Sequence, residues 1–116
     1  MIERYRPLPK ELRLGFSKIH DIGLFAKEKI NRGKNLGISH IQIGKELFRT
    51  PLGGFINHKP VIKGEDASGE LVELSGPNCE KVKQRADGAK IEWRLVTRQD
   101  IKAGEELTLE YTFYKI

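Results

Sequence analysis

The sequence predicts a single, mostly β domain with very little helix. The chain has 116 residues, a length typical of one domain. Its twelve glycines and five prolines interrupt the chain often, and both residues disfavour helix interiors. Between these breaks lie short alternating apolar and polar runs, spaced at roughly 8–12 residues, which is typical of consecutive strands. No stretch has the composition of a linker, so residues 1–116 are expected to form one domain.

The first half of the chain carries four such runs. They predict strands over 12–17, 24–26, 35–41 and 46–49. Residues 31–33 (Asn-Arg-Gly) predict a turn before the third strand. The stretch 50–57 contains one proline and two glycines, which predicts a turn or a single helical turn.

The second half begins with a polar stretch and continues with a hairpin. Residues 59–76 are polar and contain three glycines, so we expect a loop insertion with one strand at 70–74. Runs at 79–85 and 90–97 flank Asp87-Gly88, a strong signal for a β-hairpin. A turn is expected at 102–105. The last strand is expected over 106–111, with Leu107, Leu109 and Tyr111 on one face, because strand side chains alternate.

Composition excludes several classes of protein. The single cysteine cannot support a disulfide framework or a zinc site built on several cysteines. No apolar run approaches the ~18 residues of a membrane span, and the N-terminus lacks the apolar segment of a signal peptide. The 21 basic and 16 acidic residues give a net charge of +5, which permits acidic partners without requiring them.

Three segments place polar or turn residues within apolar sequence. The first is Ser-Lys-Ile-His-Asp-Ile-Gly-Leu-Phe-Ala at 17–26. The second is Gly-Gly-Phe-Ile-Asn-His at 53–58, followed later by Pro-Asn-Cys at 77–79. The third is Asp-Ile-Lys-Ala-Gly-Glu-Glu-Leu-Thr-Leu-Glu-Tyr at 100–111. Taken singly, they also fit a plain hairpin turn, an Asn-capped turn with a surface histidine, and a core tyrosine.

Together, and in this order, the three segments resemble the SET domain of protein-lysine methyltransferases. The resemblance covers about residues 17–114, and it identifies the chain as a minimal, stand-alone SET domain with its core at 12–114. It implies a β-clip fold of several short sheets with a C-terminal pseudoknot. It also implies transfer of a methyl group from S-adenosylmethionine to a lysine side chain in a protein.

The resemblance assigns roles residue by residue. It implies that the turn at Asp21, Ile22, Gly23 and Leu24 binds the cofactor, together with Asn57, His58 and Tyr111. The family usually has Gly-x-Gly where this chain has Asp-Ile-Gly. Glycine adopts positive φ readily and aspartate tolerates it better than most residues, so a sharp turn is expected here.

The remaining roles concern the substrate side and the scaffold. Tyr111 is expected to be catalytic and to orient the lysine nitrogen. Phe55, Leu109 and Phe113 are expected to line the lysine channel, and Asn78 is expected to be structural. Because Leu109 is smaller than the Phe or Tyr that relatives often carry there, addition of more than one methyl group is expected.

Other chemistry is not favoured by the remaining polar residues. The three histidines and Cys79 have no metal-ligand spacing, so no metal is expected. Cys79 is expected to be a structural thiol rather than a nucleophile. Glu105 and Glu106 are adjacent, so their side chains should diverge, and we interpret them as turn and surface charge.

The expected partner is a basic, lysine-containing protein or peptide, with nucleic acid at most an indirect partner and no membrane. Residues 59–76 hold four acidic and two basic side chains. This loop is therefore a hypothetical negative lip for a basic peptide, a homodimer contact, or simply a solvated hairpin. By analogy with small SET domains the protein is expected to be cytoplasmic and of bacterial, archaeal or viral origin, or in the host nucleus if viral. The alternative is a catalytically silent β-clip module that binds a charged protein or nucleic acid.

Overall fold

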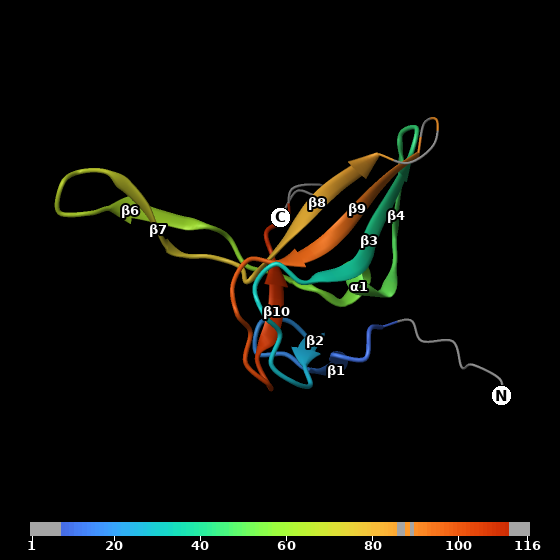
Figure 1. Ribbon diagram of the computed structural model, residues 1–116, viewed down its shortest axis with the longest axis horizontal. Coiled ribbons are helices and arrows are strands. Elements are labelled where there is room, and N and C mark those ends of the chain that lie inside the picture. The colour runs from blue at the N-terminus through green and yellow to red at the C-terminus, as the bar shows by residue number, and fades with distance from the viewer. Residues whose placement is uncertain (1–7, 86–87, 89, 112–116) are drawn as a thin grey trace.

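The computed structural model describes residues 8–85, 88 and 90–111, which form short strands and one short helix (Figure 1). The strands belong to two four-stranded sheets and one two-stranded sheet. The prediction of a mostly β fold with several small sheets and very little helix is thus confirmed. No helix in these described residues is long and apolar enough to cross a membrane.

The first sheet brings the two ends of the described chain together. Its order is β1 (Leu12–Phe16), β2 (Ile22–Ala26), β10 (Glu106–Leu109) and β5 (Asn57–His58). Strand β10 runs antiparallel to β2 and parallel to β5. The last strand therefore lies between an N-terminal hairpin and a segment from mid-chain.

The second sheet is antiparallel throughout. Its order is β4 (Glu46–Arg49), β3 (Asn35–Ile43), β9 (Lys90–Thr97) and β8 (Cys79–Arg85). The sequence predicted the bounds of β4, β8 and β9 correctly. The predicted turn at Asp87-Gly88 lies partly outside the described residues, and Gly88 has φ of +61°, as a tight hairpin turn requires.

The predicted loop 59–76 contains a second strand that the sequence analysis missed. Strand β6 (Ile62–Glu65) pairs antiparallel with β7 (Leu71–Ser75). This hairpin, residues 62–75, is called the arm below, and it projects away from both larger sheets (Figure 1).

The helical turn predicted for 50–57 is confirmed as α1 (Pro51–Phe55). A proline at its first position suits the start of a helix, where the N–H needs no intrahelical acceptor. Gly53 lets this helix approach β3 closely, because a Cβ there would lie 2.2 Å from the carbonyl oxygen of Ser39. The helix thereby holds the chain that leads into β5 against the second sheet.

Leucine and isoleucine side chains from both larger sheets form one core. Among them are Leu24 of β2, Leu95 of β9 and Leu107 of β10, each fully buried. By the usual scale, burying each such side chain stabilises the fold by about 1.5–3 kcal/mol. Because Leu107 belongs to this core, the position of β10 is fixed. The positions of Glu106 and Thr108 on the same strand are therefore fixed as well.

Candidate functional site

The turn between β1 and β2 contains the backbone strain expected from the sequence. Asp21 has φ of +37°, a region that glycine favours and aspartate tolerates. Its carbonyl accepts the N–H of Ser17 at 2.8 Å, which closes the turn. Gly23 was also expected to supply positive φ, but it lies within β2 and does not.

Gly23 is required for space instead. A Cβ at this position would lie 2.2 Å from Glu106 Oε2 and 3.0 Å from Asn57 Nδ2. Leu24 is fully buried in the core, so only its backbone is left to face a ligand. The four predicted residues of this turn therefore differ in role. Ile22, through its carbonyl oxygen, and Gly23, through its lack of a side chain, lie against the polar network described next.

A partly buried polar network joins this turn to β5 and β10. The Asn57 side-chain amide donates to Glu106 Oε2 at 2.9 Å and to Ser17 Oγ at 3.0 Å. It also lies within hydrogen-bonding distance of the carbonyl oxygens of His20 and Ile22, at 3.0 and 3.3 Å. Two N–H bonds are thus shared among four acceptors, which fixes the Asn57 side chain.

Ser17 and Glu106 complete the network, and the sequence analysis did not assign a role to either. The Ser17 hydroxyl lies 2.8 Å from both carboxylate oxygens of Glu106. It also accepts the N–H groups of Ile19 and His20 at 2.9 and 3.3 Å. The interpretation of Glu106 as a surface charge was therefore wrong, because a pattern of alternating faces does not show which strand a carboxylate will meet.

Tyr111 is held at two points by the residues before and within β5. Its hydroxyl donates to the carbonyl oxygen of Ile56. Its backbone N–H donates to Nδ1 of His58 at 2.9 Å, and the two rings lie 5.1 Å apart at 49°. Strand β10 ends at Leu109, so Tyr111 follows the strand rather than lying within it as predicted.

Asn78 ties the segment before β8 to β10. Its side-chain oxygen accepts the N–H of Thr108 at 2.8 Å, and its amide donates to the carbonyl oxygen of Glu106 at 2.8 Å. Asn78 Nδ2 also reaches the Glu105 carboxylate at 3.1 Å. These bonds attach the buried Asn78 side chain to β10.

A cavity of about 450 Å³ lies beside the polar network. Ile19, His58, Glu105, Glu106 and Thr108 are among its lining residues. Its size is within the range of small-molecule sites, and its two glutamates outnumber its one lysine, Lys59, so its lining carries a net negative charge. Contrary to the expectation from their spacing, Glu105 and Glu106 therefore line the same cavity.

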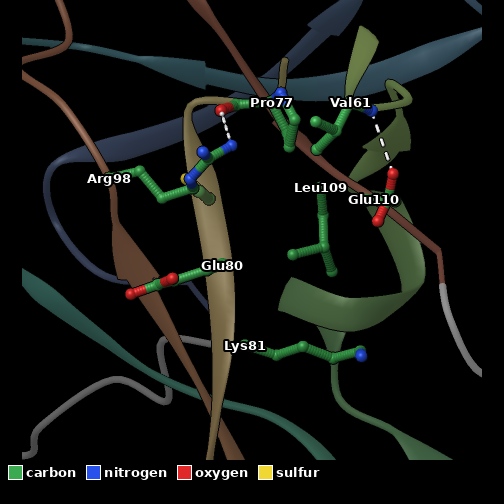
Figure 2. A pocket seen from close by; sticks show the side chains of 8 residues that line it. Val61, Pro77, Glu80, Lys81, Arg98, Leu109 and Glu110 are labelled. Atoms are coloured by element: carbon green, nitrogen blue, oxygen red, sulfur yellow. Dashed lines mark hydrogen bonds between the residues drawn. The ribbon is translucent and has the colours of Figure 1, made fainter. Parts of the chain in front are cut away.

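A second cavity, of about 280 Å³, is lined by residues of β8, by Leu109 of β10 and by residues next to these strands (Figure 2). Leu109 and Glu110 contribute to it from β10 and the residue after it, whereas Glu106 and Thr108 line the first cavity. Figure 2 shows Leu109 between the Arg98 and Glu80 side of the cavity and the Val61 and Glu110 side. Residues of β10 therefore line both cavities.

The charged groups of the second cavity are held by specific contacts. Glu110 accepts the N–H of Val61 at 2.9 Å. Arg98 donates to the carbonyl oxygen of Pro77 at 2.9 Å and to the Glu73 carboxylate at 2.7 Å. Burial lowers the pKa of Lys81 from its ordinary value, and the Glu110 carboxylate opposes that change.

Of the other residues that the sequence analysis considered, Cys79 lines the second cavity. Phe55 lies at the end of α1 and is 39% exposed; it lines neither cavity. Phe113 lies outside the described residues. Burial raises the pKa of the Cys79 thiol to about 12, with the Glu105 carboxylate adding to the effect, so the thiolate needed for nucleophilic attack is not populated at neutral pH. No group of three candidate metal ligands occurs in the described part of the chain.

Comparison with known proteins finds a likeness of fold and none of sequence. No family model and no curated protein matches the sequence. In contrast, 94 chains of solved structures match the structure of this protein, so its arrangement of strands occurs in other proteins. One is a Plasmodium falciparum protein provisionally assigned as a histone methyltransferase, with a TM-score of 0.63 and 14% sequence identity. The match covers 91% of this chain and 96% of that chain.

The match extends over nearly the whole of both chains, so this protein shares the fold of that protein. Its site combines a cavity lined by two glutamates, a tyrosine hydroxyl held on a main-chain carbonyl, and a second cavity that also takes residues from β10 and its end.

Proposed function

We propose that the chain is a minimal SET domain that transfers a methyl group from S-adenosylmethionine to the side-chain amine of a lysine in a basic protein. The observation that carries this proposal is the position of Tyr111. Its hydroxyl lies on the Ile56 carbonyl and its N–H on His58, which joins the third sequence segment to the second. The passage of β10 between β2 and β5 is consistent with the pseudoknot that the resemblance implies.

The larger cavity is the proposed site for S-adenosylmethionine, which would supply a methyl carbon activated by a sulfonium. Glu105 and Glu106 suit a positively charged ligand, because carboxylates stabilise nearby cations. His58 lines this cavity, and the turn at 21–24 is linked to it through Asn57, which contacts both the carbonyl oxygen of Ile22 and Glu106. The Asn57 amide already donates hydrogen bonds to Ser17 and Glu106. We therefore propose that Asn57 replaces one of these hydrogen bonds by a bond to the ligand when the ligand binds.

The reaction requires a neutral lysine amine as the nucleophile. With a reference pKa near 10.4, removing the proton from lysine at pH 7 costs about 4.6 kcal/mol. An apolar channel lowers this pKa, so water can accept the proton and no dedicated base is required. Catalysis is then mainly a matter of position.

In our proposal, Tyr111 holds the lysine amine in the position required for attack. Its hydroxyl proton is directed to Ile56 O, and in our proposal its oxygen accepts an N–H of the incoming amine. The nitrogen lone pair is thereby aimed away from the tyrosine. Leu109, buried and facing the smaller cavity, cannot hydrogen-bond a water beside the amine, which favours addition of more than one methyl group.

Three measurements test the proposal. Calorimetry should detect binding of S-adenosylhomocysteine, and labelled S-adenosylmethionine should transfer its methyl group to lysine-rich proteins. Tyr111→Phe should retain binding and lose transfer by about 100-fold or more, whereas Ser68→Ala, which removes a hydroxyl on the distant arm, should retain both. Mass spectrometry should find dimethyl- or trimethyl-lysine, and a product that stops at monomethyl-lysine contradicts the role of Leu109.

The competing proposal is a silent binding module, and Asp21 at the usual glycine position favours it. A folded protein that fails to bind S-adenosylhomocysteine at millimolar concentration would support this alternative. Binding without transfer to any lysine-rich protein would likewise contradict the enzyme proposal.

A further inference from the structure

A basic loop joins β2 to β3, and nothing described above assigns it a role. Residues 27–34 read Lys-Glu-Lys-Ile-Asn-Arg-Gly-Lys, with four basic residues and one acidic residue, so this loop carries a net charge of +3 in a chain whose total is +5. All four basic residues are exposed. Positive charge concentrated on one exposed segment is the usual electrostatic signature of a surface that binds a polyanion.

The basic loop borders a third cavity, of about 390 Å³. The segment before β1 contributes Lys10 and Glu11 to its lining, and the loop contributes the rest. The charged lining residues carry a net charge of +2; they are Lys10, Lys29, Arg32 and Lys34 with Glu11 and Glu28. This cavity shares no lining residue with the two cavities beside β10. The fold therefore gathers cations that lie apart in the sequence into a separate, positively charged site.

The end of β9 and the residues after it hold the backbone of the loop in one shape. Ile30 and Ile101 exchange two backbone hydrogen bonds, each of 2.8 Å. The Thr97 hydroxyl donates to the carbonyl oxygen of Asn31 at 2.7 Å and accepts the N–H of Lys34 at 2.9 Å. The loop is thus preorganised, because a ligand would have to order its side chains and not its backbone.

The cations of the cavity are not neutralised by the protein itself. Within the described part of the chain, none of the four basic side chains that line the cavity forms an ion pair. Asp100 lies beside the loop, but its carboxylate accepts the backbone N–H of Arg32 at 2.8 Å. Its negative charge is offset by Lys27, a loop residue that does not line the cavity. An excess of positive charge therefore remains for an external anion.

The lining of the cavity favours a nucleic acid over an acidic protein. Its one large apolar residue is Ile30, which is buried and 3% exposed. Protein–protein interfaces have an apolar core, and this cavity offers none. Interfaces with nucleic acids are more polar and much more positively charged. Four cations contributed by two segments also suit a row of phosphates better than a single one.

From these observations we propose that the cavity between the basic loop and the segment before β1 binds the phosphate backbone of a nucleic acid. The basic side chains that line it donate to phosphate oxygens, whereas the bases are not contacted. Binding is therefore independent of base sequence and weakens as the salt concentration rises. The inference is independent of methyl transfer, and either proposal can fail without the other.

Fluorescence anisotropy of a labelled DNA duplex of about 20 base pairs tests the proposal, at salt concentrations from about 50 to about 300 mM. Four phosphate contacts predict a slope of about −3 to −4 when the logarithm of the binding constant is plotted against that of the salt concentration. The loop variant Lys29→Gln/Lys34→Gln should bind at least about tenfold more weakly at the lowest salt, with a slope shallower by about 2. The matched control Lys45→Gln/Lys63→Gln removes the same charge from exposed residues elsewhere and should bind as the wild type does.

A second variant should change the affinity in the opposite direction. Glu28→Gln removes a carboxylate from the lining of the cavity, so it should bind the duplex several-fold more tightly, because like charge no longer opposes the phosphates. Glu70→Gln on the arm removes the same charge at a distance and should leave the affinity unchanged. A damaged fold would not tighten binding, and thermal unfolding of each variant shows that it is folded.

Four results would overturn the proposal. A wild-type chain that does not bind the duplex at the lowest salt excludes the site. Equal losses in the loop variant and the matched control assign binding to net charge alone. Calorimetry that shows sodium pyrophosphate binding more tightly than the duplex at the same ionic strength assigns the cavity to a free phosphate compound. Polyglutamate that displaces the duplex at an equal concentration of charge assigns it to an acidic polypeptide.

Discussion

Gly23 lies where β5 and β10 bring their polar side chains closest to β2. A Cβ there would occupy the position of the Glu106 carboxylate, 2.2 Å from Oε2. Glu106 would have to move and would lose its contacts with Ser17 and Asn57. Gly23→Ala should therefore destabilise the fold by about 2 kcal/mol, because polar groups of a partly buried network lose their partners.

Urea unfolding of a double-mutant cycle checks this prediction. In a Glu106→Ala background the carboxylate is already absent, so Gly23→Ala should cost less than half as much as it does in the wild type. Equal costs in both backgrounds would show that Gly23 is required for another reason.

Single residues also show how far sequence reasoning reaches. The positive φ of Asp21 could be predicted, because the constraint is local to one turn and one residue type. The role of Glu106 could not be predicted, because it depends on the pairing of β10 with β2, 80 residues earlier in the chain. From the sequence alone, two neighbouring charged residues on a strand cannot be distinguished. The strand pairing is needed to show which partner each side chain contacts.

At the level of elements, the arm contributes little to the stability of the body. Its base is held by the Glu73–Arg98 ion pair and by the bond from Val61 to Glu110, and a partly exposed ion pair is worth at most about 1 kcal/mol. Ile62 and Ser75 face each other across the hairpin, so Asn-Gly can replace residues 63–74 as a tight turn.

This excision should change the free energy of unfolding of the monomer by less than about 2 kcal/mol, as measured by urea titration at low concentration. The same shortening applied to the β8–β9 hairpin should prevent folding, because β9 carries the fully buried Leu95. A shortened arm that unfolds the whole chain would show that the arm belongs to the core.

The elements that the sequence predicted best are those with local signals. The bounds of β4, β8 and β9 follow from alternation between turn residues, and α1 follows from Pro51 and the two glycines after it. Strand β6 was missed because Ile62 is its one large apolar residue, so it lacks an apolar face. Likewise, the end of β10 at Leu109 depends on the contacts of Tyr111 with residues far away in the sequence. The local pattern of apolar and polar residues does not reveal those contacts.

For the whole molecule, the second cavity takes Glu80 and Lys81 from β8, so the second sheet must keep its position for that cavity to keep its shape. His40 is where this sheet meets its neighbours. It is buried on β3, opposite Arg49 of β4 and Trp93 of β9. Its Nδ1 lies 2.9 Å from the Ser39 hydroxyl, and Gly53 of α1 lies against its ring.

The position of His40 makes stability depend on pH. Burial lowers its pKa from 6.5 to about 4, and the positive charges of Lys81 and Arg49 act in the same direction. Above pH 6.5 both the folded and unfolded chains hold a neutral imidazole, so the stabilising contribution is complete. As the pH falls from 6.5 toward 4, the unfolded chain binds the proton first, and up to about 3 kcal/mol of stability should be lost.

Comparison with His40→Gln isolates this contribution from that of the carboxylates, which also titrate below pH 5. The free energy of unfolding of each protein is measured by urea titration at half-unit steps from pH 7.5 to 4. The difference between wild type and variant should be constant above pH 6.5 and should shift against the wild type below it. Parallel curves over the whole range would mean that folding leaves the pKa of His40 unchanged.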